Sequence, residues 1–119
     1  MIDQLIMRCF HARTNAHVLH LTTQSYAKHK ALNEFYDGIV DLADSIAEGY
    51  MGEHGVIEFT SPYRYAPQAD PVKLIEELKE WIEQHRYEAV EAEDTYIQNV
   101  IDEVVMLCAS TLYLLKRLK

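Results

Sequence analysis

The 119-residue sequence contains few residues that interrupt regular structure, with only four glycines and three prolines. Long uninterrupted elements are therefore expected, and helices are the natural ones. The only cysteines are Cys9 and Cys108, far apart in the chain, which speaks against a disulfide framework and favours a reducing compartment, the cytoplasm. No apolar run approaches the roughly 20 residues that span a bilayer, and no signal peptide is visible at the start. We therefore expect no membrane partner.

Basic residues are also scarce. Eleven lysines and arginines stand against nineteen acidic residues, which gives a formal charge of −8 and a pI near 5.1. Non-specific nucleic-acid binding needs basic side chains that neutralise phosphates, so DNA binding is not expected. A hydrophobic share of 49% is enough for a packed core and excludes a disordered chain. The length fits one domain.

Apolar residues recur at three- and four-residue steps, the spacing of amphipathic helices. Ser25 and the Asp70-Pro71 pair are signals for helix starts, and Gly52 is a signal for a helix end. Four amphipathic helices in one domain predict an all-α, antiparallel four-helix bundle. The expected helices are about 2–21, 25–51, 71–87 and 94–118.

Residues 52–70 form the one long connection. Loops longer than about 12–15 residues are commonly functional, disordered or packed on something. This one contains Phe59, Tyr63 and Tyr65, and its aromatic content favours packing. The sequence leaves two interpretations open: packing against a partner subunit, or a self-packed loop that covers one end of the bundle.

The second predicted helix carries a polar sector. His29, Asn33, Asp44 and Glu48 fall within about 100° of one another around the helix, well away from its apolar stripe. Imidazole and carboxylate form a ligand set for iron, manganese or zinc, although a solvated acidic face gives the same pattern. No Glu-x-x-His occurs in the chain, which speaks against a di-iron centre inside the bundle. An outward-facing site would need a second subunit, related by two-fold symmetry, to complete its ligands.

With His17 added, the five positions 17, 29, 33, 44 and 48 resemble the ferroxidase motif of Dps-like mini-ferritins. In that family two histidines and an acid come from one subunit, and an Asp-x-x-x-Glu pair comes from its two-fold mate. Two departures are visible, because Asn33 stands where the family has an acid and Val18 where it has a tryptophan. The lysine-rich tail is also absent and the chain is short. These features suit a shortened, phage-encoded member.

The resemblance implies a ferritin-like bundle and a function. His17, His29, Asp44 and Glu48 would hold one or two iron(II) ions, or another divalent metal, and Asn33 would make one position weak. Peroxide or dioxygen would oxidise the iron in a ferroxidase-like reaction, and ferric iron would be stored. The protein would be a homo-oligomer of two-fold dimers, as large as a dodecamer, in the cytoplasm, of the host if the source is viral.

Other interpretations stay open. His20 lies within the first helix's apolar stripe, where a satisfied core histidine is favoured over a metal ligand, although it could support a ligand by hydrogen bonding. Arg13 and His20 have a spacing used by some dimeric helical ribonucleases. A non-catalytic helical oligomer that binds a partner would also account for Asn33. His11, His54 and His85 show no partners in the sequence and are expected at the surface.

Overall fold

The computed structural model describes residues 1–61 and 64–118, and every regular element in these ranges is a helix. The helices begin and end within three residues of the sequence expectation, so the all-α prediction is confirmed. The four helices are α1 (Ile2–Thr22), α2 (Tyr26–His54), α3 (Pro71–Ala89) and α4 (Thr95–Arg117).

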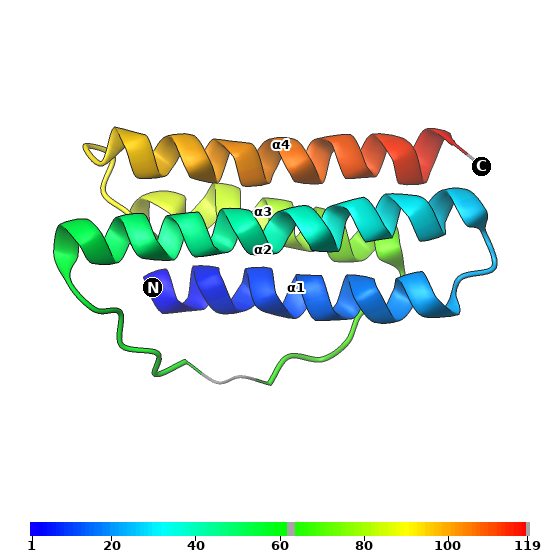
Figure 1. The fold of residues 1–119 in the computed structure, drawn as a ribbon, viewed down its shortest axis with the longest axis horizontal. Helices are drawn as coiled ribbons and strands as arrows, with labels where there is room; N and C mark the ends of the chain where they lie inside the picture. Colours follow the sequence, from blue (N-terminus) through cyan, green and yellow to red (C-terminus); the bar gives the residue numbers. More distant parts are fainter. Residues whose placement is uncertain (62–63, 119) are drawn as a thin grey trace.

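The helices form a four-membered bundle with one long crossover (Figure 1). α1 packs on α2 and α3, and α4 packs on the same two helices. Each of these neighbouring pairs is antiparallel, whereas α2 and α3 run in the same direction and are joined by the crossover, residues 55–70 (Figure 1). The predicted antiparallel four-helix bundle is therefore confirmed. A single long crossover is also the connectivity of ferritin-like bundles, but a shared connectivity does not establish a shared function.

Two of the helix starts are capped as expected. The Ser25 hydroxyl accepts a hydrogen bond from the backbone N–H of Lys28 at 3.2 Å. The Asp70 carboxylate accepts one from the N–H of Val72 at 2.9 Å, and Pro71 occupies the first helical turn. These side chains satisfy N–H groups that have no partner within the helix. The sequence therefore fixes where α2 and α3 begin.

The end of α2 differs from the expectation. The helix continues through Gly52 to His54, and Gly55 follows it with a φ of 95°. The N–H of Gly55 still donates to the carbonyl of Met51 at 3.0 Å, which closes the last turn. Only glycine adopts this backbone conformation at low cost. Gly55, not Gly52, is therefore the residue that terminates α2.

The turn between α3 and α4 contains no strong helix breaker. Instead, the side chain of Gln98 in α4 holds the turn, because its amide donates a hydrogen bond to the carbonyl of Val90 at 2.8 Å. The Arg86 guanidinium donates in turn to the Gln98 side chain at 2.9 Å and to Asp102 at 2.7 Å. A polar network centred on the buried Gln98 and reaching the exposed Asp102 thus holds the chain reversal.

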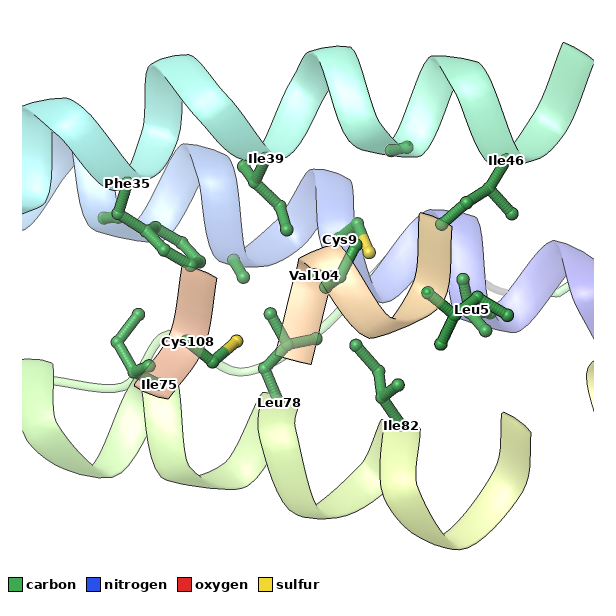
Figure 2. Close-up of a cluster of buried hydrophobic side chains, with 14 of the residues drawn as sticks. Leu5, Cys9, Phe35, Ile39, Ile46, Ile75, Leu78, Ile82, Val104 and Cys108 are labelled. Carbon is green, nitrogen blue, oxygen red and sulfur yellow. The ribbon is translucent and has the colours of Figure 1, made fainter. Parts of the chain in front are cut away.

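The core runs the length of the bundle, and all four helices contribute to it (Figure 2). Cys9 and Cys108 are free thiols within it. Burial raises the pKa of each to about 12, so neither is a nucleophile near neutral pH. The labelled residues of this core are Leu5, Cys9, Phe35, Ile39, Ile46, Ile75, Leu78, Ile82, Val104 and Cys108.

The crossover packs on its own chain. The Asp3 carboxylate accepts hydrogen bonds from the N–H groups of Thr60 and Ser61, at 3.2 and 3.0 Å, and from the Ser61 hydroxyl at 2.7 Å. Farther along α1, Asn15 donates to the Gln68 carbonyl at 2.9 Å and accepts from its N–H at 2.7 Å. The crossover therefore runs along α1 instead of covering an end of the bundle (Figure 1). The expected contributions of Pro62 and Tyr63 lie outside the described residues.

α4 is the one described helix whose length and composition would allow it to cross a membrane, with a mean hydropathy of 1.2. A core helix of a bundle passes the same test. The buried stripe of α4, from Ile97 to Leu115, faces α2 and α3, which is how a core helix packs. The expected lack of a membrane partner stays a prediction.

Candidate histidine and carboxylate site

Three histidines and a tyrosine gather where α1 meets the start of α2. The rings of His17 and Tyr36 stack with their centroids 4.2 Å apart, and those of His20 and His29 stack at 3.7 Å. The His20 ring also meets Tyr36 edge-on at 5.3 Å. A short turn joins the two antiparallel helices, so the last residues of α1 lie beside the first residues of α2. The helical hairpin therefore brings His17, His20 and His29 together.

His20 and His29 exchange hydrogen bonds across the hairpin. The Nδ1 of His20 lies 2.7 Å from the carbonyl oxygen of His29, and the Nδ1 of His29 lies 2.8 Å from the carbonyl oxygen of His20. Because a carbonyl only accepts, both Nδ1 atoms carry a proton, and the neutral tautomer that fits this geometry has its lone pair on Nε2. Metal-binding histidines are commonly oriented in this way.

The same contacts have a structural role. The His20 carbonyl belongs to the last turn of α1, where carbonyl groups have no partner within the helix. His29 satisfies it, and the His20 side chain is only 7% exposed. The pair therefore ties α1 to α2 whether or not a ligand is present, as expected for a satisfied core histidine.

Asn33 lies one turn after His29. Its amide oxygen accepts from the Tyr36 hydroxyl at 2.7 Å, and its amide nitrogen donates to Asp37 at 3.0 Å. The residue thereby positions Tyr36 against His17. Its oxygen is a poorer metal ligand than a carboxylate, and it already has a hydrogen-bond donor. A hollow of about 320 Å³ opens beside it, lined by His20, Tyr26, His29, Lys30, Asn33 and Glu34.

Asp44 and Glu48 are exposed on α2, as the polar sector predicted, but they are distant from the histidines. At 1.5 Å per residue they lie about 22 and 28 Å along the helix from His29. Within residues 1–61 and 64–118 no three histidine, cysteine or acidic side chains form a group that could hold a metal ion. One chain therefore does not bring the predicted ligands together, and the predicted site would need another subunit to join them.

Sequence reasoning missed the partners of three other histidines. His54 donates from Nε2 to Asp94 at 2.6 Å, and this hydrogen bond raises its pKa. His85 lies 3.2 Å from Glu88. His54 is exposed and His85 is half-buried. The sequence showed no partner for His54, because Asp94 is 40 residues away and becomes a neighbour only in the folded bundle.

His11 is half-buried beside Tyr65, with ring centroids 5.0 Å apart. Burial and the neighbouring Arg8 lower its pKa. Its partner comes from the crossover, whose path the sequence did not predict.

Arg13 and His20 do not form a catalytic pair within one chain. They are separated by two turns of α1, or about 10 Å along the axis, and the His20 Nδ1 is engaged with a backbone carbonyl. The ribonuclease interpretation would need both residues to meet across a dimer.

Comparison with known proteins gives a relative from Enterobacteria phage T4. This relative is described as an uncharacterized 14.6 kDa protein in the mobD-ri intergenic region. It is 28% identical over 115 residues, which cover 95% of this chain and 86% of the relative. No solved structure matches the chain. The phage connection expected from the sequence agrees with this relative.

The assignment to the Dps-like mini-ferritins was wrong. The matching family is described only as one of unknown function, and the match spans residues 20–115. The motif was misleading for a physical reason: side chains spaced by whole helical turns share a sector on any outward polar face. Asn33 and Val18 already departed from the pattern. The chain belongs to the family of unknown function DUF5856.

Proposed function

We propose that this protein forms a two-fold homo-oligomer that binds iron(II), or another divalent metal ion, between the α2 helices of two subunits. One observation carries the proposal. His29 and Glu48 are equidistant from the point on α2 between Gly38 and Ile39, and so are Asn33 and Asp44. A two-fold axis across α2 at that level would therefore place each residue of both pairs opposite its counterpart on the mate.

The donor set fits a divalent transition metal. The His29 ring is fixed with Nε2 free of hydrogen bonds to described residues, and Asp44 and Glu48 are exposed carboxylates. Imidazole with carboxylate is the set preferred by iron, manganese and zinc. His17 would add a second imidazole from the same hairpin, while His20 orients His29. Asn33 predicts that one metal position is tight and the other weak.

Bound iron(II) would be the substrate, and peroxide or dioxygen would be its oxidant. The chain's own contribution would be to hold the ion and to exclude alternative ligands, because the imidazoles are fixed before the metal arrives. We further expect that the two-fold dimers assemble into a closed shell, as large as a dodecamer, and that ferric product is stored inside it. The buried free thiols and the phage relative support a setting in the host cytoplasm.

The test uses metal-dependent stability and a complementation experiment. Zinc or anaerobic iron(II) should raise the melting temperature of the wild type, since a ligand of the native state stabilises it. His29→Ala and Glu48→Ala should each abolish this gain, whereas the control His85→Ala, on α3, should keep it.

Co-expression of the two inactive variants sharpens the result. A mixed dimer of His29→Ala and Glu48→Ala contains one intact site, formed by His29 of one chain and Glu48 of the other. The purified mixed dimer should contain half of the metal bound by the wild-type dimer, measured by elemental analysis, and should regain iron(II) oxidation. Absence of metal in the wild type, or no recovery in the mixed dimer, would overturn the proposal.

A second candidate is a non-catalytic interaction protein. Large apolar side chains are exposed around the α1–α2 turn: Val18 is 53% exposed, Leu21 69% and Tyr26 75%. Such a cluster suits a partner surface. This candidate predicts that metal never changes the melting temperature, and that Leu21→Asp lowers the native mass or abolishes partner binding while His29→Ala does not.

A further inference from the structure

A groove lies on α1 beside the crossover, separate from the histidine cluster. Its volume is about 530 Å³, within the range of small-molecule sites. Its walls are apolar or aromatic, formed by Met7, Phe10, Phe59 and Tyr65, and its polar groups include Arg13 and His11. None of these six residues is a candidate metal ligand, so the groove can be argued independently of the proposed metal site.

Arg13 has no counter-charge among the residues that the structure describes. No hydrogen bond or ion pair joins its guanidinium to another residue in the described ranges, and its Nε is buried without a partner. The Nε of Arg8 is likewise buried without a partner. Its nearest aromatic contact is the Phe10 ring, at 5.8 Å. Buried donors are usually satisfied, and this chain carries nineteen acidic residues. An arginine left unpaired in such a chain indicates that its partner comes from outside the fold.

A neighbouring hollow of about 230 Å³ shares His11 and Tyr65 with the groove. It contains Arg8, whose guanidinium lies 5.4 Å from the Tyr65 ring and 4.7 Å from the Trp81 ring. It also contains Glu77, which repels an anion. The larger groove contains Arg13 and has no acidic residue among its described lining residues. Of the two hollows, it is therefore the one that favours a negatively charged ligand.

We propose that this groove binds a small organic anion, a carboxylate or phosphate group attached to an aromatic or aliphatic body. The Arg13 guanidinium offers paired donors that match either head group. The aromatic side chains on both walls bury the apolar body. The crossover forms one wall, and the hydrogen bonds that attach it to Asp3 and Asn15 of α1 hold this wall in place.

A matched pair of fluorescent probes tests the charge requirement. The probe 8-anilinonaphthalene-1-sulfonate carries an anionic group, and N-phenyl-1-naphthylamine has the same aromatic body without it. The folded wild type should bind the sulfonate with one site per chain and the neutral probe at least tenfold more weakly. Equal affinity for the two probes would overturn the proposal.

Two arginine variants locate the binding. Arg13→Gln should weaken sulfonate binding about ten- to a hundredfold, because a charge-assisted contact is lost, and leave the neutral probe unchanged. Arg117→Gln, on the exposed end of α4, is the matched control and should bind as the wild type does. Unchanged sulfonate affinity in Arg13→Gln, with a wild-type melting temperature, would contradict the assignment.

Competition identifies the head group. Phenyl phosphate or benzoate should displace the sulfonate probe. The competitor that binds more tightly carries the head group that the groove prefers. Displacement by neither would contradict the proposal. A lower native mass for Arg13→Gln, together with no probe binding by the wild type, would also overturn it, because carboxylates of a second copy of the chain would then be the partner of Arg13.

Discussion

At the scale of single residues, Asp3, Asn15 and Gln98 are buried polar side chains that hold backbone segments outside the helices. They are 5%, 6% and 7% exposed, and each is hydrogen-bonded to a connection. A buried polar group without such a bond would be destabilising. These roles could not be predicted from the sequence, because helical periodicity separates apolar from polar positions and does not identify the partner of a polar one.

Asp3 predicts a pH dependence of stability. Hydrogen bonds from Ser61 and Thr60 hold the pKa of its carboxyl well below its usual value of 3.8. Its stabilising contribution is therefore complete above about pH 4 and is lost as the pH falls toward the folded-state pKa. Asp3→Asn should lower the free energy of unfolding by about 1–3 kcal/mol at pH 7, with a smaller difference at pH 3, measured by urea denaturation. The exposed Asp41→Asn should show neither effect.

At the scale of elements, α2 ends between two glycines that have different backbone conformations. Gly52 lies within the helix, where a methyl group would meet no atom within 4 Å, whereas Gly55 has a positive φ. Glycine within a helix is unfavourable relative to alanine, but at a positive φ it is the favoured residue. The same substitution should therefore have opposite effects at positions three residues apart.

Thermal unfolding of two variants tests this difference. Gly52→Ala should stabilise the protein by about 0.5–1 kcal/mol, and Gly55→Ala should destabilise it by about 1–3 kcal/mol. Neither position lines the groove or the histidine cluster, so changes in packing do not complicate the comparison. A stabilising Gly55→Ala would show that α2 extends beyond His54 in solution.

At the scale of the whole molecule, long-range contacts close the bundle. The crossover is bound to the start of α1 at Asp3 and farther along it at Asn15, and His54 at the end of α2 bonds to Asp94 at the start of α4. These contacts join segments that are 40 to 58 residues apart in the sequence. Of these contacts, the one between His54 and Asp94 connects the hairpin of α1 and α2 to the hairpin of α3 and α4 at one end of the bundle, whereas the other two attach the crossover to α1.

The contact between His54 and Asp94 predicts a second pH effect of the opposite sign. The hydrogen bond that His54 donates to Asp94 raises the pKa of His54 above 6.5, so its stabilising contribution is complete below that value and is lost as the pH rises through the folded-state pKa. The melting temperature of His54→Gln should therefore fall below that of the wild type at pH 5.5 and approach it at pH 8.5. Asp94→Asn should remove the same pH dependence, and a constant difference across this range would contradict the assignment.

The candidate site was predictable only in part. Helical phase placed Asp44 and Glu48 on the exposed face of α2 from spacing alone, whereas the gathering of His17, His20 and His29 at the hairpin appears only in the structure. The reciprocal hydrogen bonds of His20 and His29 were not predictable, since they depend on how two helices pack. The groove beside Arg13 was also missed, because its wall is a crossover whose path has no periodicity.

The sequence by itself determined the helices, most of their boundaries and the bundle, because apolar periodicity and capping residues act over a few residues. It did not determine the family, since spacing within one helix is shared by unrelated proteins. Only the tertiary structure decided where the crossover runs, which polar side chains hold it and which arginine Nε atoms have no partner among the described residues. These features depend on contacts between residues far apart in the chain, and such contacts exist only once the four helices have packed.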